Sequence, residues 1–195
     1  MKKLMKIFIT SVIALSFCTF NSSVTEAAKK ASYLQNTKKV YVFNDFIDGV
    51  KRTYNLKYTK KSNGNYFWQD KLSYKEISYA FKEKETTKGL YHDGYLALAY
   101  PIKKGKTWKT WSGTVCKTTS TNKTIKVKAG TFKNVIEVTC DHGSPYPGYP
   151  EYSKFYYVKS VGKILTKYTY TTNDSKGNKV KDTVTLYELV KLKNR

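Results

Sequence analysis

The chain has 195 residues and carries 36 lysines and arginines against 14 aspartates and glutamates, which gives a formal charge of +22. This length suits one domain that buries a hydrophobic core. The charge predicts attraction to polyanions but says little about the fold. No second long apolar run follows the N-terminal one, so we expect no transmembrane segment in the mature chain.

The first 27 residues have the layout of a secretory signal peptide. A basic start, MKKLMK, precedes an apolar run of about 14 residues, and small residues follow it. A bilayer needs about 20 apolar residues, so this run is too short to span one comfortably. We expect cleavage after Ala27 and a secreted protein that associates with the cell wall. Cys18 is interpreted as an ordinary apolar residue, because Phe17 and not a small residue precedes it.

The rest of the chain is dominated by strand patterns. Residues 28–37 are polar without a clear period and predict a flexible lead-in, and residues 38–195 form the expected β-rich domain. Residues 51–61 alternate apolar and polar side chains, which is typical of a strand with one buried face. The pair Asn63-Gly64 favours a tight turn, so residues 65–70 are predicted to return as the second strand of a hairpin.

The middle of the chain is more mixed. Residues 75–85 fit a strand or a short helix, and we favour the strand because aromatic and β-branched residues dominate. Asp93-Gly94 predicts a second turn, and residues 122–140 predict a hairpin around Ala129-Gly130. Strand signals recur about every 8 to 12 residues. The fold class is therefore mainly β, a single-domain curved antiparallel sheet or a partly open barrel, with a short helix as the minor alternative.

The mature chain contains two cysteines, Cys116 and Cys140. An even number of cysteines in an exported protein favours a disulfide. If residues 123–128 pair with residues 131–140, the strand that carries Cys116 can lie beside Cys140. We expect this bridge to contribute about 3 kcal/mol to stability.

The sequence Cys140-Asp141-His142 resembles a thiol catalytic site, but three points argue against it. Neighbouring side chains on an extended chain point to opposite sides. Cys140 has an expected disulfide partner, and one further histidine, His92, is too little for a metal site of three or four ligands. No GxSxG, HExxH or Walker motif occurs, and acidic residues such as Glu83 and Glu137 are interpreted as surface counter-charges. We expect no enzyme, no catalytic residues, no metal and no cofactor.

Lysines interleaved with aromatic rings are the remaining signal. Lysines attract anionic backbones and rings stack on sugars or bases, although strand alternation alone also produces such a pattern. Tyrosines spaced by three would share one face of an extended proline-type helix, which predicts a contact ridge in the loop after Cys140. The candidate binding residues are Lys103, Lys104, Lys106, Trp108, Lys109, Trp111, Tyr146, Tyr149 and Tyr152.

Three segments, YPIKKGKTW (100–108), KVKAGTFKNVIEV (126–138) and FYYVKSVGKILT (155–166), resemble a loose family of exported or lipid-anchored bacterial proteins. Ser160 stands where that family often has glycine. The resemblance covers about the last half of the chain and implies a half-open, curved antiparallel barrel of the lipoprotein-carrier type. Its motifs are structural rather than catalytic, and most members have no assigned activity.

Together these observations predict a secreted, non-enzymatic protein that binds anionic envelope polymers or lipid headgroups, without specific nucleic-acid binding. A carrier or sensor that holds an apolar ligand in the concave face of the sheet is the alternative. A hydrolase is the second alternative. The sequence leaves the oligomeric state open.

Overall fold

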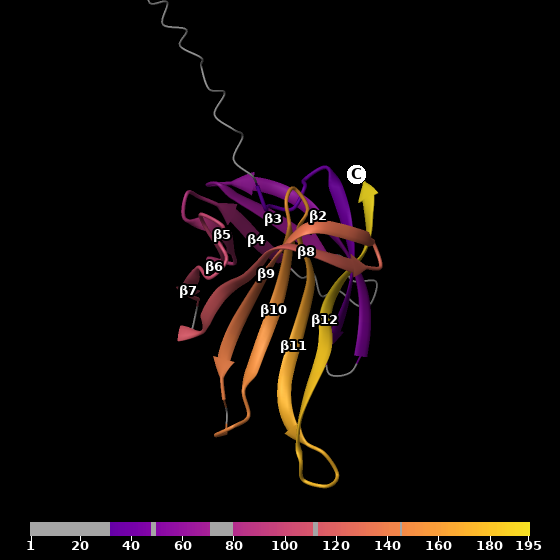
Figure 1. Cartoon of the computed structure of the whole chain (residues 1–195). Coiled ribbons are helices and arrows are strands. Elements are labelled where there is room, and N and C mark those ends of the chain that lie inside the picture. The colour runs from indigo at the N-terminus through magenta and orange to yellow at the C-terminus, as the bar shows by residue number, and fades with distance from the viewer. Residues whose placement is uncertain (1–31, 48–49, 71–79, 111–112, 145) are drawn as a thin grey trace, which may run out of the picture. The chain divides into compact units, whose positions relative to one another are not determined.

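The computed structural model describes residues 32–47, 50–70, 80–110, 113–144 and 146–195. Within these ranges the chain forms one antiparallel sheet of twelve strands and no α-helix (Figure 1). The expected mainly β fold is confirmed. The strands are β1 (Lys39–Ile47), β2 (Val50–Ser62), β3 (Asn65–Asp70), β4 (Ala80–Glu85), β5 (Gly89–His92), β6 (Tyr95–Ala99), β7 (Thr107–Lys109), β8 (Val115–Val127), β9 (Gly130–Gly143), β10 (Glu151–Val158), β11 (Gly162–Asn173) and β12 (Lys179–Asn194).

Some expectations fall outside the described residues. The signal peptide, residues 1–27, is one of them. Residues 75–85 are predicted to form a strand, with a short helix as the alternative. The described part of this segment is the strand β4. The two predicted tight turns are confirmed, because Asn63-Gly64 and Asp93-Gly94 both have positive φ at both positions, the backbone that two-residue hairpin turns require.

β1 pairs with β2 on one side and with β12 on the other, so it joins the two halves of the curled sheet. Strands β2 to β6 follow in order on the first side, and β12 back to β7 follow in order on the second. Nearly all connections are therefore hairpins between neighbours. The two free edges of the sheet belong to β6 and β7, which are consecutive in the chain, and the barrel is nearly closed at this seam.

The seam between β6 and β7 is bridged by a side chain. Trp108 on β7 donates a hydrogen bond from Nε1 to the carbonyl oxygen of Leu96 on β6, with an N–O distance of 2.9 Å. The ring is 9% exposed and packs with Leu90, Leu98 and Val138 in one of two hydrophobic clusters. Trp108 therefore holds the two edges of the sheet together.

The part of the other cluster that lies inside the barrel, beside the β1–β12 pair, is rich in aromatic rings. Tyr41, Phe43 and Trp68 are fully buried. The ring of Phe43 stacks on Tyr187 of β12 with centroids 4.1 Å apart, and the rings of Tyr41 and Trp68 meet edge to face at 5.7 Å. Such ring pairs add about 0.5–1.5 kcal/mol each beyond the area that they bury.

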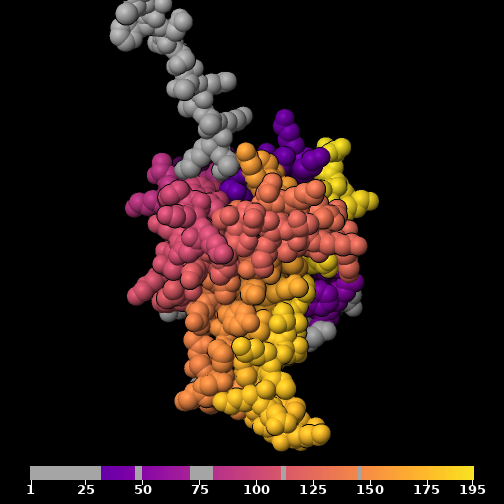
Figure 2. All heavy atoms as spheres, in the orientation of Figure 1, coloured from indigo at the N-terminus to yellow at the C-terminus, as the bar shows by residue number. Residues whose placement is uncertain are grey.

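The hairpin of β8 and β9 bends across the outside of β10 to β12 (Figures 1 and 2). Its tip is fixed by two hydrogen bonds to β12, from Ala129 N to Leu189 O at 3.1 Å and from Lys128 N to Glu188 Oε1 at 3.1 Å. Register shifts between Thr118 and Ile125 let the long β8 strand turn in this way. The hairpin covers apolar residues on the outer face of the sheet, among them Tyr156 and Leu165.

Part of the expected flexible lead-in is packed against the sheet. Tyr33 and Gln35 are buried, and their backbone N–H groups donate to Glu85 Oε1 at 3.1 Å and Glu83 Oε2 at 3.2 Å. A Cβ atom added at Gly162 would lie 2.7 Å from Cγ of Gln35, so this approach needs a glycine. The segment therefore ties β4 to the start of β11.

We expect Trp108→Phe to destabilise the protein by about 1–2 kcal/mol, because the ring stays while the carbonyl of Leu96 loses its donor. Trp108→Ala should cost about 3–5 kcal/mol, since it also removes a buried ring. Guanidinium chloride denaturation measures both. Equal midpoints for Trp108→Phe and the parent protein would show that the hydrogen bond does not secure the seam.

Candidate functional site

A half-open cavity of about 430 Å³ lies on the inner face of the sheet, under the seam between β6 and β7. This volume lies within the range of about 300–1,000 Å³ that is usual for small-molecule sites. Most of its wall is apolar, and a few ionisable groups point into it. The lining residues are Glu83, Leu90, His92, Tyr95, Leu96, Ala97, Thr110, Thr114, Cys116, Cys140, His142, Phe155, Tyr157 and Lys163.

Strand alternation explains how acidic residues come to face the interior. On β4, Phe81 and Glu83 are buried, whereas Lys82 and Lys84 are exposed. Side chains of a strand alternate between the two faces of the sheet, so the lysines occupy the outside and the carboxyl group the inside. The prediction that Glu83 is a surface counter-charge is therefore wrong. Glu137 is also buried, under an ion pair with Lys123 at 2.6 Å.

Glu83 is 3% exposed and accepts the hydrogen bond from Gln35. Burial raises the pKa of this carboxyl group to about 7, although the hydrogen bond from Gln35 and the charge of Lys163 oppose the rise. Loss of water disfavours the charged form of an acid, so Glu83 is divided between its neutral and ionised forms near neutral pH.

Lys163 on β11 faces the same cavity. Its Nζ lies 4.8 Å from the ring centroid of Tyr187 and 6.0 Å from that of Phe155. Burial lowers the pKa of this lysine, and the charges of Glu83 and Asp93 work in the opposite direction. Among the described residues, no carboxylate lies within ion-pair distance of its ammonium group.

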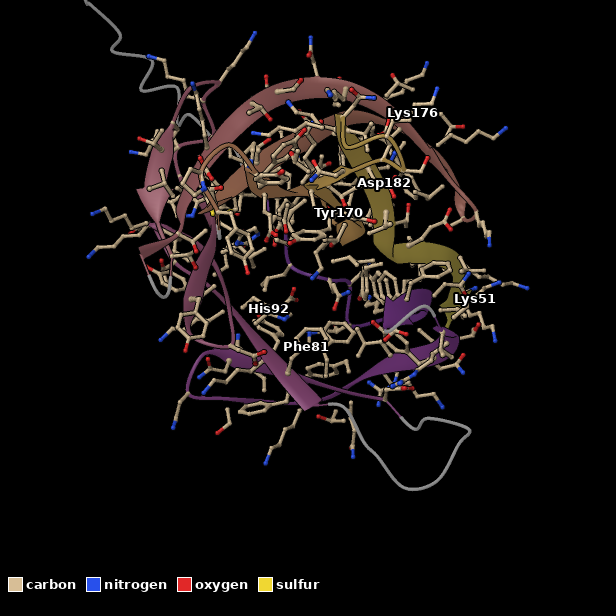
Figure 3. The ribbon with its side chains drawn as sticks, turned by 90° about the horizontal axis from the view of Figure 1, so that it is seen from below. Lys51, Phe81, His92, Tyr170, Lys176 and Asp182 are labelled. Carbon is tan, nitrogen blue, oxygen red and sulfur yellow. A yellow bond between two sulfur atoms is a disulfide. The ribbon has the colours of Figure 1, made fainter. Side chains whose placement is uncertain are left out.

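His92 lines the same cavity as Lys163 and packs against Phe81. Its ring centroid is 4.4 Å from that of Phe81, and both side chains project into the interior in Figure 3. Burial lowers the pKa of His92 to about 3, and the charge of Lys163 adds to the effect. The ring is therefore neutral at physiological pH, and its 3.6 Å contact with Asp93 is not an ion pair.

Cys116 and Cys140 form the predicted disulfide and lie directly opposite each other on β8 and β9. Because Cys140 is bonded to Cys116, it offers no free thiol. Both cysteines form part of the cavity wall. His142 is held by Ser153 Oγ, 2.8 Å from its Nε2. In the described residues there is no group of three or more histidine, cysteine or acidic side chains that could hold a metal ion.

The predicted binding residues that the structure describes are not among the residues that line this cavity. Lys103, Lys104, Lys106 and Lys109 are exposed around β7, whereas Trp108 is a core residue and Trp111 lies outside the described residues. Burial of Trp108 follows from its place at the seam. Its ring is therefore not available on the surface beside these lysines.

The three tyrosines of the predicted ridge have different surroundings. Tyr146 is 70% exposed. Tyr149 donates from its hydroxyl to Asn173 Oδ1 at 3.0 Å, and Lys179 Nζ lies 4.6 Å from its ring centroid. Tyr152 belongs to β10 and is half-buried. Of the three tyrosines of the expected ridge, Tyr146 alone is exposed to a binding partner.

A second hollow, of about 610 Å³, lies on the outside where β2 meets the ends of β1 and β12. Three cations, Lys57, Lys193 and Arg195, line it together with the amide side chains of Asn55 and Asn194. No acidic side chain is among its described lining residues. We call it the basic groove. The amino-acid sequence alone does not reveal this groove, because its residues come from strands that are far apart in the chain.

No family model matches the chain, and no curated protein matches it. Two solved structures are similar over 84% of the chain. One is a protein described as exported, with a YmcC-like fold, from Bacteroides fragilis NCTC 9343, at 10% identity, 100% coverage of that chain and a TM-score of 0.43. The other is a protein described as a lipoprotein from Parabacteroides distasonis ATCC 8503, at 11% identity, 99% coverage of that chain and a TM-score of 0.46.

Likeness at this level carries no argument about function, and the family resemblance of the three sequence segments stays an expectation. No helix in the described part of the chain is both long and apolar enough to cross a bilayer. The candidate site therefore rests on the geometry of the cavity itself.

We expect Glu83→Gln to change how stability depends on pH. The pKa of Glu83 is raised from 4.5 to about 7 in the folded state, so its stabilising contribution is complete below pH 4.5 and is lost as the pH rises through 7. Relative to Glu83→Gln, the parent protein should lose about 3 kcal/mol between pH 4 and pH 8.

Guanidinium chloride denaturation at several pH values measures this difference. Glu188→Gln removes one carboxyl group from the outer face and controls for the change in net charge. A parent protein and a Glu83→Gln variant whose stabilities run parallel across this range would contradict the assignment of Glu83 as a buried acid with a raised pKa.

Proposed function

We propose that the protein is exported and acts, without catalysis, as a carrier or sensor of an amphipathic ligand held inside the barrel. The observation that supports this most is the half-open cavity inside the sheet, which has a mostly apolar wall and a small set of ionisable groups. Sites of this kind bind small molecules by burying apolar surface, while the few polar groups fix orientation. The aromatic cluster fills the interior beside β1 and β12, so the space for a ligand lies under β5, β6, β9 and β10.

The wall of the cavity suits an alkyl or ring system. Leu90, Leu96 and Phe155 present carbon surfaces, and the disulfide adds another non-hydrogen-bonding surface. Burial of each methylene group of a ligand contributes about 0.8 kcal/mol. A medium-length chain therefore provides enough apolar surface for specific binding.

Ala97→Trp should abolish ligand binding, because Ala97 lines the cavity and an indole ring would occupy it. Displacement of a fluorescent hydrophobic probe measures binding, and mass spectrometry of an organic extract detects ligand that copurifies. Val180→Trp is the control, since Val180 is 38% exposed on β12 and the new ring would remain outside. Loss of binding in both variants, or no probe uptake by the parent protein, would contradict the proposal.

Association with anionic envelope polymers is a second candidate function, and the basic groove favours it. Its three cations come from different places in the chain: Lys57 lies on β2, Lys193 lies on β12, and Arg195 follows β12. Charge contacts on an exposed surface are screened by salt. Amide side chains beside the cations are suited to the hydroxyl groups of a polyol or sugar.

We expect the triple variant Lys57→Gln, Lys193→Gln, Arg195→Gln to elute from immobilised poly(glycerol phosphate) at clearly lower salt than the parent protein. The triple variant Lys103→Gln, Lys104→Gln, Lys106→Gln loses the same charge and is the matched control. Equal shifts in the two variants would show that net charge alone governs retention, and retention of the parent protein at about 1 M salt would contradict electrostatic binding.

A further inference from the structure

The cavity is lined by a lysine, Lys163, that no described carboxylate pairs. Within the described residues, Lys163 has ring faces of Tyr187 and Phe155 near its ammonium group but no carboxylate within ion-pair distance. Lys163 is half-buried in this half-open cavity, and a charge with reduced access to water is costly unless it is paired. Cation–π contacts offset only part of that cost.

The groups around Lys163 leave the site open to an anion. Two acidic residues act electrostatically on Lys163. One is the buried Glu83 on β4, and the second is Asp93 at the turn after β5. The side chain of Asp93 is 42% exposed, so water screens its charge. His92 is neutral, and Glu83 is ionised only in part near neutral pH. Lys163 is thus incompletely neutralised by its neighbours.

We propose that Lys163 holds the anionic headgroup of an amphiphile, a carboxylate or a phosphate monoester, whose apolar part lies against Leu90, Leu96 and Phe155. All four residues line the same cavity, so one ligand can contact the cation and the apolar wall together. This inference rests on the proposed carrier function and adds the chemical class of its ligand.

The many lysines on the outside do not provide an equivalent contact. They are exposed, and ion pairs at the surface contribute about 0–1 kcal/mol. Inside the barrel the effective dielectric constant is lower, so the same pair of charges interacts more strongly. Selection between anionic, neutral and cationic headgroups is therefore expected inside the cavity and not on the lysine-rich surface.

The test is displacement of a bound hydrophobic probe by four ligands of equal chain length: dodecanoate, dodecyl phosphate, dodecanol and dodecylamine. The parent protein should bind at least one of the two anions at least tenfold more tightly than dodecanol, and dodecylamine most weakly. Dodecanoate and dodecyl phosphate distinguish a carboxylate from a phosphate headgroup. In Lys163→Met the preference for anions should disappear while dodecanol still binds.

Lys167→Met is the matched control, because Lys167 lies on the same strand but lines a hollow on the outer face under the β8–β9 hairpin. It should keep the preference of the parent protein. Lys163→Gln is the second variant, which removes the charge but keeps a polar side chain, and thermal unfolding verifies that each variant folds.

An anion preference that survives in Lys163→Met and Lys163→Gln, or its absence in the parent protein while dodecanol binds, would overturn the role of Lys163 and leave the carrier function standing. Failure of all four ligands to displace the probe, or of the probe to bind, would overturn the carrier function as well.

Discussion

The pairing of β1 with β12 is the interaction on which the rest of the structure depends. It joins residues about as far apart as the chain allows, such as Lys39 and Asn194, and it turns two runs of consecutive hairpins into one curled sheet. The stack of Phe43 on Tyr187 stabilises this pair from the inside. The same Tyr187 ring lies against Lys163. Closure of the sheet and the properties of the cavity are therefore physically linked.

Once the sheet is curled, strand alternation separates the charges. Lysines such as Lys82 and Lys84 remain in water on the outside, whereas Glu83 is carried into the interior. The size of the side chains decides which part of the interior is filled and which part is left open. Aromatic rings fill it beside β1 and β12, and smaller residues such as Ala97 and Leu96 leave the space under the seam. One sheet thus carries two candidate sites, a half-open cavity on the inside and the basic groove on the outside.

Local features of this fold could be predicted from the sequence. The strand alternation and the tight turns depend on neighbours in the chain, as in residues 51–61, Asn63-Gly64 and Asp93-Gly94. The disulfide of Cys116 with Cys140 follows from the number of cysteines in the mature chain. The cavity could not be predicted in this way. Lys163 reaches it at an irregular stretch, because the register between β10 and β11 shifts at Tyr156 and Tyr157. For Glu83 a signal was present, since Phe81, Glu83 and Glu85 share one face of β4 and lysines take the other.

The central claim is that the barrel holds an anionic amphiphile with its headgroup at Lys163. A high-resolution crystal structure of the protein with dodecanoate tests it most directly. The account predicts density for a carboxylate within hydrogen-bond distance of Lys163 Nζ and for an alkyl chain along Leu96 and Phe155. A cavity filled only by ordered water, with Lys163 paired to Glu83 and dodecanoate absent or bound on the outer surface, would contradict it.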